Sequence, residues 1–168
     1  ILGKVAIKEG YDVKVSEVHG MSQRGGSVVT YVKYGDKVYS PIIDRGEADL
    51  ILAFEMLEAM RALPYLKKGG TMIANTQKMN PMPVITGAME YPENIEEKLS
   101  AKINLQAVDA LSLAEKAGTI KAVNVVLIGL LAKSMDVDKN VWIDVIKETV
   151  PEKFLDVNIK AFELGYEL

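Results

Sequence analysis

The 168-residue sequence contains no cysteine, one histidine and one tryptophan. Without cysteine, the chain supplies no thiolate to an iron–sulfur cluster, forms no disulfide and has no cysteine nucleophile. With one histidine, a zinc site of its own would need several carboxylates as well, and no such cluster stands out in the sequence. We therefore expect that this chain alone holds no metal or redox cofactor.

The chain also lacks a strong charge imbalance and a long hydrophobic run. Its 20 lysines and arginines against 23 aspartates and glutamates give a formal net charge of −3, which offers no electrostatic attraction for nucleic acid or an anionic membrane. The longest apolar stretch, 122–132, is interrupted by Asn124 and is too short to cross a bilayer. No signal peptide is visible, so we expect a cytoplasmic protein with neither nucleic acid nor membrane as a partner.

Hydrophobic residues make up 49% of the chain, and its length fits one domain, residues 1–168, with a well-buried core. Short strand-like segments alternate with helical ones, which is typical of βαβ units. We therefore predict a three-layer α/β/α fold with a mostly parallel sheet, one hairpin and a helical C-terminal third. The predicted strands are 11–15, 27–34, 48–54, 71–75 and 103–108, and the main predicted helices are 1–9, 55–66, 109–117, 124–134, 139–149 and 151–165.

Three local expectations accompany this fold. Tyr34–Tyr39 has the pattern of a hairpin turn, Lys67–Gly70 that of a helix stop, and Thr76–Gly87 that of an irregular surface loop. The first helix lacks a capping residue and a preceding strand, so we expect that residues are missing upstream.

The segment from Ser16 to Val28 is the part of the sequence that core packing explains least. It is a polar, glycine-bearing stretch between two strand-like segments, the kind of place where a fold presents backbone amides and side chains to a ligand or partner. His19 is one candidate in it, either as a hydrogen-bond or proton donor at a substrate or, more simply, as a residue that secures its own loop. Neither Ser22 nor Ser27 has a convincing acid for a catalytic triad with this histidine.

Arg24 precedes two glycines, Gly25 and Gly26. A guanidinium group offers a rigid fork to phosphate or carboxylate, and neighbouring glycines let a ligand approach the backbone. The alternative is a plain turn in which the arginine pairs with Glu17 or with another chain. Asn75 is a further candidate because it ends a predicted parallel strand, where α/β sheets bind ligands, although asparagine is also a common turn former.

The full set of candidate residues combines this segment with the strand end. Capping accounts for Glu55, and core packing accounts for Trp142. The candidates for ligand or partner contact are Glu17, His19, Gly20, Ser22, Gln23, Arg24, Gly25, Gly26, Ser27 and Asn75.

The run His-Gly-Met-Ser-Gln-Arg-Gly-Gly at 19–26 resembles the signature of the gamma-type domain family of 2-oxoacid:ferredoxin oxidoreductases, in the version of the indolepyruvate branch. The resemblance extends to residues 49–55, the strand end at Asn75 and the helix containing Asn124. Members of this family begin with a strand and a Gly-Gly-Gln-Gly turn, and this sequence begins inside the helix that follows them.

The resemblance implies a subunit that is inactive alone and belongs to a hetero-oligomer. A large partner chain would carry thiamine diphosphate and iron–sulfur clusters, electrons would pass to ferredoxin, and coenzyme A would accept the acyl group. His19 would then hydrogen-bond the substrate or the partner's cofactor site, and Arg24 would meet a phosphate or carboxylate. Two alternatives stay open: a purely structural assembly subunit, and a stand-alone nucleotide- or acyl-binding protein.

Overall fold

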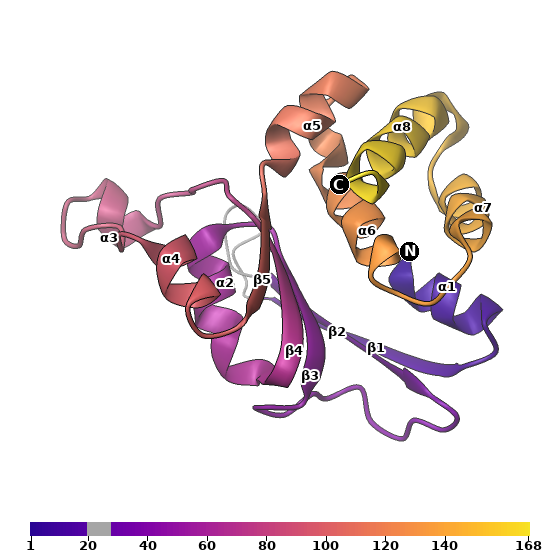
Figure 1. Ribbon diagram of the computed structural model, residues 1–168, viewed down its shortest axis with the longest axis horizontal. Helices are drawn as coiled ribbons and strands as arrows, with labels where there is room; N and C mark the ends of the chain where they lie inside the picture. The colour runs from indigo at the N-terminus through magenta and orange to yellow at the C-terminus, as the bar shows by residue number, and fades with distance from the viewer. Residues whose placement is uncertain (20–27) are drawn as a thin grey trace.

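The structure is a computed structural model that describes residues 1–19 and 28–168 (Figure 1). Helices α2 (Met56–Ala62) and α4 (Ile95–Ser100) cover one face of a parallel sheet, and the C-terminal helices cover the other. The sheet has the order β3-β4-β5, with strands Ala48–Ala53, Leu66–Asn75 and Asn104–Val108. The predicted three-layer α/β fold with a parallel sheet is confirmed.

Most other elements follow the predicted order, but a short helix at Met82–Ile85 lies inside the segment 76–87, which we predicted to be an irregular loop. The remaining helices and strands are α1 (Leu2–Lys8), β1 (Asp12–His19), β2 (Val28–Gly35), α3 (Met82–Ile85), α5 (Ala110–Ala117), α6 (Val123–Lys133), α7 (Lys139–Thr149) and α8 (Leu155–Tyr166). Short 3-10 turns occur at Leu63–Tyr65, Ile120–Ala122 and Glu152–Phe154. Among the described residues, no helix has both the length and the apolar character needed to cross a membrane.

Successive side chains of the central strand β4 point alternately into the two helical layers that cover the sheet. Met72 and Ala74 are fully buried in the cluster formed with α2 and α4, whereas Ile73 lies in the cluster formed with the C-terminal helices. This is the expected result of a strand whose successive residues point to opposite faces, with both faces covered. The short apolar runs in the sequence therefore mark strands buried on both sides.

The C-terminal layer is built around α6, whose apolar sequence places it between other elements. Asp138 caps α7 as predicted, accepting a hydrogen bond from the Asn140 N–H at 2.7 Å. Trp142 on α7 stacks near Phe162 on α8, with ring centroids 6.5 Å apart, and both are fully buried. The predicted packing role of Trp142 is confirmed.

Strands β1 and β2 form an antiparallel pair separate from the parallel sheet, with Asp12 opposite Gly35 and His19 opposite Val28. The prediction that Tyr34–Tyr39 turns one strand into another was wrong, because no strand follows β2 until β3. The carboxylate of Asp12 accepts a hydrogen bond from the Val38 N–H at 2.9 Å, so a side chain rather than a strand holds this segment.

The prediction that Lys67–Gly70 ends a helix was also wrong, because these residues lie inside β4. Gly69 has a φ of +83°, and a Cβ on Gly70 would lie 2.9 Å from the Asp49 carbonyl oxygen. The register against β3 shifts here, between Ala48 and Leu50. The two glycines therefore form a bulge that lets β3 and β4 approach closely.

Candidate functional site

The end of the β1–β2 hairpin carries two of the predicted residues, Glu17 and His19. Both are exposed and lie opposite Thr30 and Val28, respectively, in β2. Because they are two residues apart on one strand, they project from the same face. The structure thus brings these two candidates together, and their roles stay predictions. The other candidates from this part of the chain lie outside the described residues: Gly20, Ser22, Gln23, Arg24, Gly25, Gly26 and Ser27.

Asn75 lies at the carboxyl end of β4, as predicted, in a different sheet from Glu17 and His19. Its side chain is completely buried. The amide oxygen accepts from the Ala110 N–H at 3.1 Å, and the amide nitrogen donates to the Phe54 carbonyl at 3.2 Å and to Gln77 Oε1 at 3.3 Å. Asn75 therefore joins the ends of β3 and β4 to the start of α5, and its predicted role in ligand binding stays a prediction.

A buried carboxylate next to this strand end was not predicted as a site residue. Glu55 caps α2, accepting from the Glu58 N–H at 2.9 Å, which confirms its predicted capping role. Its other oxygen accepts from the Met79 N–H at 3.2 Å and from the Tyr91 hydroxyl. Three donors thus replace the water that a buried carboxylate would otherwise need.

The Tyr91 hydroxyl is fixed as a hydrogen-bond donor by its surroundings. Burial, followed by the hydrogen bond to Glu55 and the charge of that carboxylate, raises the pKa of Tyr91 well above its usual range. Lys78 places its ammonium group 5.7 Å from the centre of the Tyr91 ring, within reach of a cation–π attraction. Tyr91 therefore stays protonated at neutral pH and secures its segment to α2.

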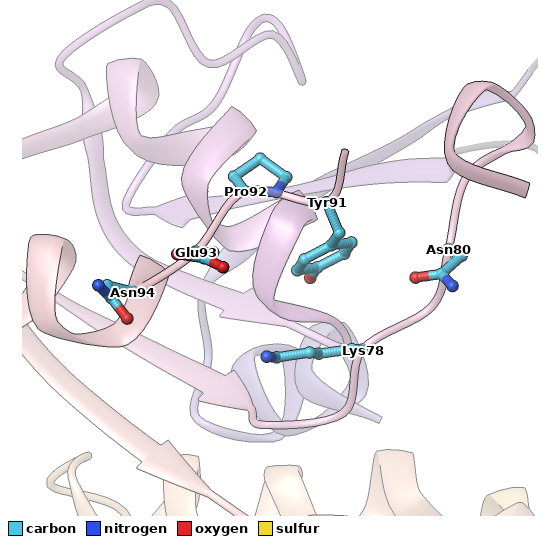
Figure 2. Close-up of a pocket in the computed structure, with 6 residues that line it drawn as sticks. All are labelled: Lys78, Asn80, Tyr91, Pro92, Glu93 and Asn94. Carbon is cyan, nitrogen blue, oxygen red and sulfur yellow. The ribbon is translucent and has the colours of Figure 1, made fainter. Parts of the chain in front are cut away.

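A hollow of about 460 Å³ lies beyond the carboxyl end of β4, and Tyr91 is among the residues that line it (Figure 2). A second hollow of about 440 Å³ shares Lys78, Pro92 and Asn94 with it. Crevices at this edge of an α/β sheet are common ligand sites. The residues that line the first hollow are Lys78, Asn80, Tyr91, Pro92, Glu93 and Asn94.

The chemistry of this hollow is that of hydrogen bonding and mixed charge. Lys78 contributes a positive group and Glu93 a negative one, while Asn80 and Asn94 contribute amides. In the part of the chain that the structure describes, no three histidine, aspartate or glutamate side chains gather to hold a metal ion. The hollow suits a polar group of a ligand or partner better than it suits a metal ion.

Sequence reasoning missed the Glu55 contacts beside this hollow because they join segments that are far apart in the chain. Glu55 meets partners 24 and 36 residues away, and no local motif links it to Tyr91. The one signal in the sequence was an acidic residue directly after an apolar strand, at the edge where ligands bind.

Comparisons with known proteins extend over the whole chain. The family model for pyruvate ferredoxin/flavodoxin oxidoreductase matches residues 1–168. The indolepyruvate oxidoreductase subunit IorB of Thermococcus kodakarensis is 44% identical over 98% of this chain and 85% of its own length. The ketoisovalerate oxidoreductase subunit VorA of Methanothermobacter marburgensis is 27% identical over 98% of this chain, but over 32% of its own.

A solved structure shares the fold. The keto/oxoacid ferredoxin oxidoreductase gamma subunit from Geobacter sulfurreducens superposes with a TM-score of 0.69 at 22% identity, covering 99% of this chain and 85% of that one. The arrangement of a parallel sheet, a hairpin and C-terminal helices is thus that of this gamma subunit.

Proposed function

The chain belongs to the pyruvate ferredoxin/flavodoxin oxidoreductase family, and on this premise we propose that it is the small subunit of an indolepyruvate-type 2-oxoacid:ferredoxin oxidoreductase. The observation that carries the proposal is the 44% identity to an indolepyruvate oxidoreductase subunit over nearly the whole chain. Residues 1–168 would form a single gamma-type domain. The complex would decarboxylate an arylpyruvate, releasing carbon dioxide, passing two electrons to ferredoxin and transferring the acyl group to coenzyme A.

The chain's own residues do not fit an iron–sulfur cluster or the metal that accompanies thiamine diphosphate. It has no cysteine, and within residues 1–19 and 28–168 no group of three acidic or histidine side chains gathers. In the proposed complex, thiamine diphosphate, iron–sulfur clusters and coenzyme A supply the decarboxylation, electron-transfer and acyl-accepting chemistry, with the first two held by a large partner chain. This chain is then inactive alone.

The chain's proposed contribution comes from the end of the β1–β2 hairpin. Glu17 and His19 are exposed there on one face. An exposed imidazole is a hydrogen-bond donor for a substrate or for the partner's cofactor site. Arg24 would meet a phosphate or carboxylate, and Gly25 and Gly26 would allow close approach.

The first test is assembly. The chain is co-expressed with its candidate large partner, and the complex is assayed for acyl-coenzyme A formation and reduction of an electron acceptor with indolepyruvate and with pyruvate. We expect a stable complex that prefers the aromatic substrate. If no complex with the large chain forms, the proposal fails; a complex without turnover on any 2-oxoacid would favour a purely structural subunit.

The second test is Arg24→Ala, with Arg45→Ala as a matched control at an exposed loop position. We expect an intact complex in which turnover falls or the requirement for coenzyme A rises, by about tenfold or more, because a charge-assisted contact is lost. Loss of assembly would indicate that Arg24 contacts the partner chain only. If Arg24→Ala behaves like the control, this arginine has neither role.

A further inference from the structure

The segment from Met79 to Met89 is unusual because it carries no charge and exposes large apolar side chains. We call these eleven residues the apolar excursion; they lie between Lys78 and Glu90. Its four exposed large hydrophobic residues are Met79 (57% exposed), Met82 (66%), Ile85 (64%) and Met89 (65%). Exposed apolar groups concentrated in so short a stretch, without charge, are typical of the centre of a protein interface.

The apolar excursion is held in one shape by its own backbone. Pro81 precedes α3, and the carbonyl of Pro83 accepts hydrogen bonds from the N–H groups of Ala88 and Met89 at 2.9 and 3.0 Å. These two hydrogen bonds hold the residues that follow α3 against the first turn of α3 itself. The apolar side chains are therefore carried by a segment that is closed by its own backbone hydrogen bonds.

The base of the apolar excursion is fixed by the buried carboxylate of Glu55. One of its oxygens accepts from the Met79 N–H at the start and from the Tyr91 hydroxyl just beyond the end. Both ends are thereby tied to the start of α2. Figure 1 shows α3 projecting at the end of the molecule away from α7 and α8. A preorganised projection loses little conformational entropy on binding, which favours association.

We propose that the apolar excursion docks into an apolar, charge-poor surface of the large chain of the same oxidoreductase. This inference rests on the proposed function. A family relative supports a large chain as the occupant: in VorA the matching stretch makes up 32% of the subunit, so there the domain is covalently joined to a much longer neighbour. The IorB subunit of Thermococcus kodakarensis is instead matched over 85% of its length, so a domain of this kind that is not joined to a long neighbour needs a surface through which a large chain is held.

The test measures the affinity of the chain for the large chain by a pull-down titration or biolayer interferometry. The variants are Ile85→Asp and Met82→Asp, and the control is Ile120→Asp, which alters an isoleucine that is 58% exposed on a 3-10 turn elsewhere. We expect Ile85→Asp to weaken binding by at least about 30-fold, since a central apolar contact is replaced by a buried charge. The control should bind like the unchanged chain.

Folding is checked separately, because a substitution at an exposed position should change stability little. The melting temperature and circular dichroism of each variant should match those of the unchanged chain. Ile85→Ala serves as a milder variant and should weaken binding less than Ile85→Asp does.

Each remaining outcome has a distinct meaning. Binding of both aspartate variants with unchanged affinity overturns the docking inference and leaves the proposed function standing. If the unsubstituted chain does not bind the large chain, the proposed function itself is overturned. A third outcome is that the chain forms a dimer, that Ile85→Asp dissociates this dimer, and that binding to the large chain is unchanged. The apolar excursion would then bind a second copy of this chain, and the proposal that it binds the large chain would be overturned.

Discussion

At the scale of single residues, the structure depends on a few carboxylates that accept several hydrogen bonds. Glu55 is buried and has three donors, including the Tyr91 hydroxyl. Asp12 is bonded by the Lys14 ammonium at 2.8 Å and by the Val38 N–H at 2.9 Å. In both cases the negative charge joins segments that are distant in sequence.

Removing the Tyr91 hydroxyl tests the Glu55 contacts. Tyr91→Phe should lower the free energy of unfolding by about 2 kcal/mol, because a buried carboxylate loses one of its donors. Tyr39→Phe is the matched control, since that ring is almost fully exposed and should change stability negligibly. Urea denaturation of both variants measures the difference. Equal stabilities would mean that water replaces the tyrosine hydroxyl at no cost.

The pH dependence of stability tests Asp12. The Lys14 hydrogen bond, followed by that from Val38, lowers the pKa of Asp12 to about 2. Since the unfolded value is about 3.9, the contribution of Asp12 to stability is present above pH 4 and is lost as the pH falls from about 4 to about 2. Asp12→Asn should flatten this part of the stability curve, measured by urea denaturation between pH 5 and pH 2.

Lys14→Met provides the comparison for Asp12, since it removes the largest cause of the lowered pKa and keeps the carboxylate. It should reproduce part of the effect of Asp12→Asn. An unchanged acid response in both variants would contradict this account.

At the scale of secondary-structure elements, the closest packing is between α6 and α8. A Cβ added to Gly165 would lie 1.9 Å from the Val126 carbonyl oxygen, and one added to Gly129 would lie 2.1 Å from that of Phe162. The two backbones therefore touch, and only glycine fits at either position. This contact sets the distance between the two helices that cover the sheet.

Gly165→Ala tests this helix contact. The added methyl group meets backbone atoms that cannot move aside, so the helices must separate, and we expect a loss of at least about 3 kcal/mol in the free energy of unfolding. Gly35→Ala is the matched control, because a Cβ there meets nothing within 4 Å. Thermal and chemical denaturation compare the two. A Gly165→Ala chain as stable as the control would show that α8 shifts freely.

At the scale of the whole molecule, the candidate residues occupy two places. Glu17 and His19 lie on the antiparallel hairpin, while Asn75, Glu55 and the hollow around Tyr91 lie at the carboxyl edge of the parallel sheet. The chain offers hydrogen-bonding groups and an apolar excursion, and it has no cysteine for a cluster.

The proposed complex, in which the large chain holds the iron–sulfur clusters, predicts that iron is found in the complex and not in the isolated chain. The isolated chain should be colourless, should contain no stoichiometric iron, and should keep its melting temperature in a chelator, because it has no cysteine ligands. Visible absorbance should accompany only the complex with the large chain. Metal analysis and absorption spectroscopy of both samples make the measurement, and stoichiometric iron in the isolated chain would contradict the proposal.

The sequence by itself determined the order and type of most elements, because apolar periodicity and capping are local properties. The apolar runs at 48–54 and 71–75 become buried strands, and Asp138 caps α7 as predicted. The absence of cysteine, a property of composition alone, excludes a cluster held by thiolates of this chain. The signature at 19–26 pointed to the family that the comparisons support.

Only the tertiary structure decided the conformation of Lys67–Gly70 and the partners of Glu55, because both depend on contacts between distant segments. Lys67–Gly70 matches a helix stop in sequence, yet Gly69 and Gly70 form a bulge in β4, because pairing with β3 outweighs the local signal. Glu55 was predicted to be only a cap, and its contacts with Met79 and Tyr91 exist because folding brings together segments 24 and 36 residues apart. Local sequence therefore sets where elements form, and long-range packing sets which side chains meet.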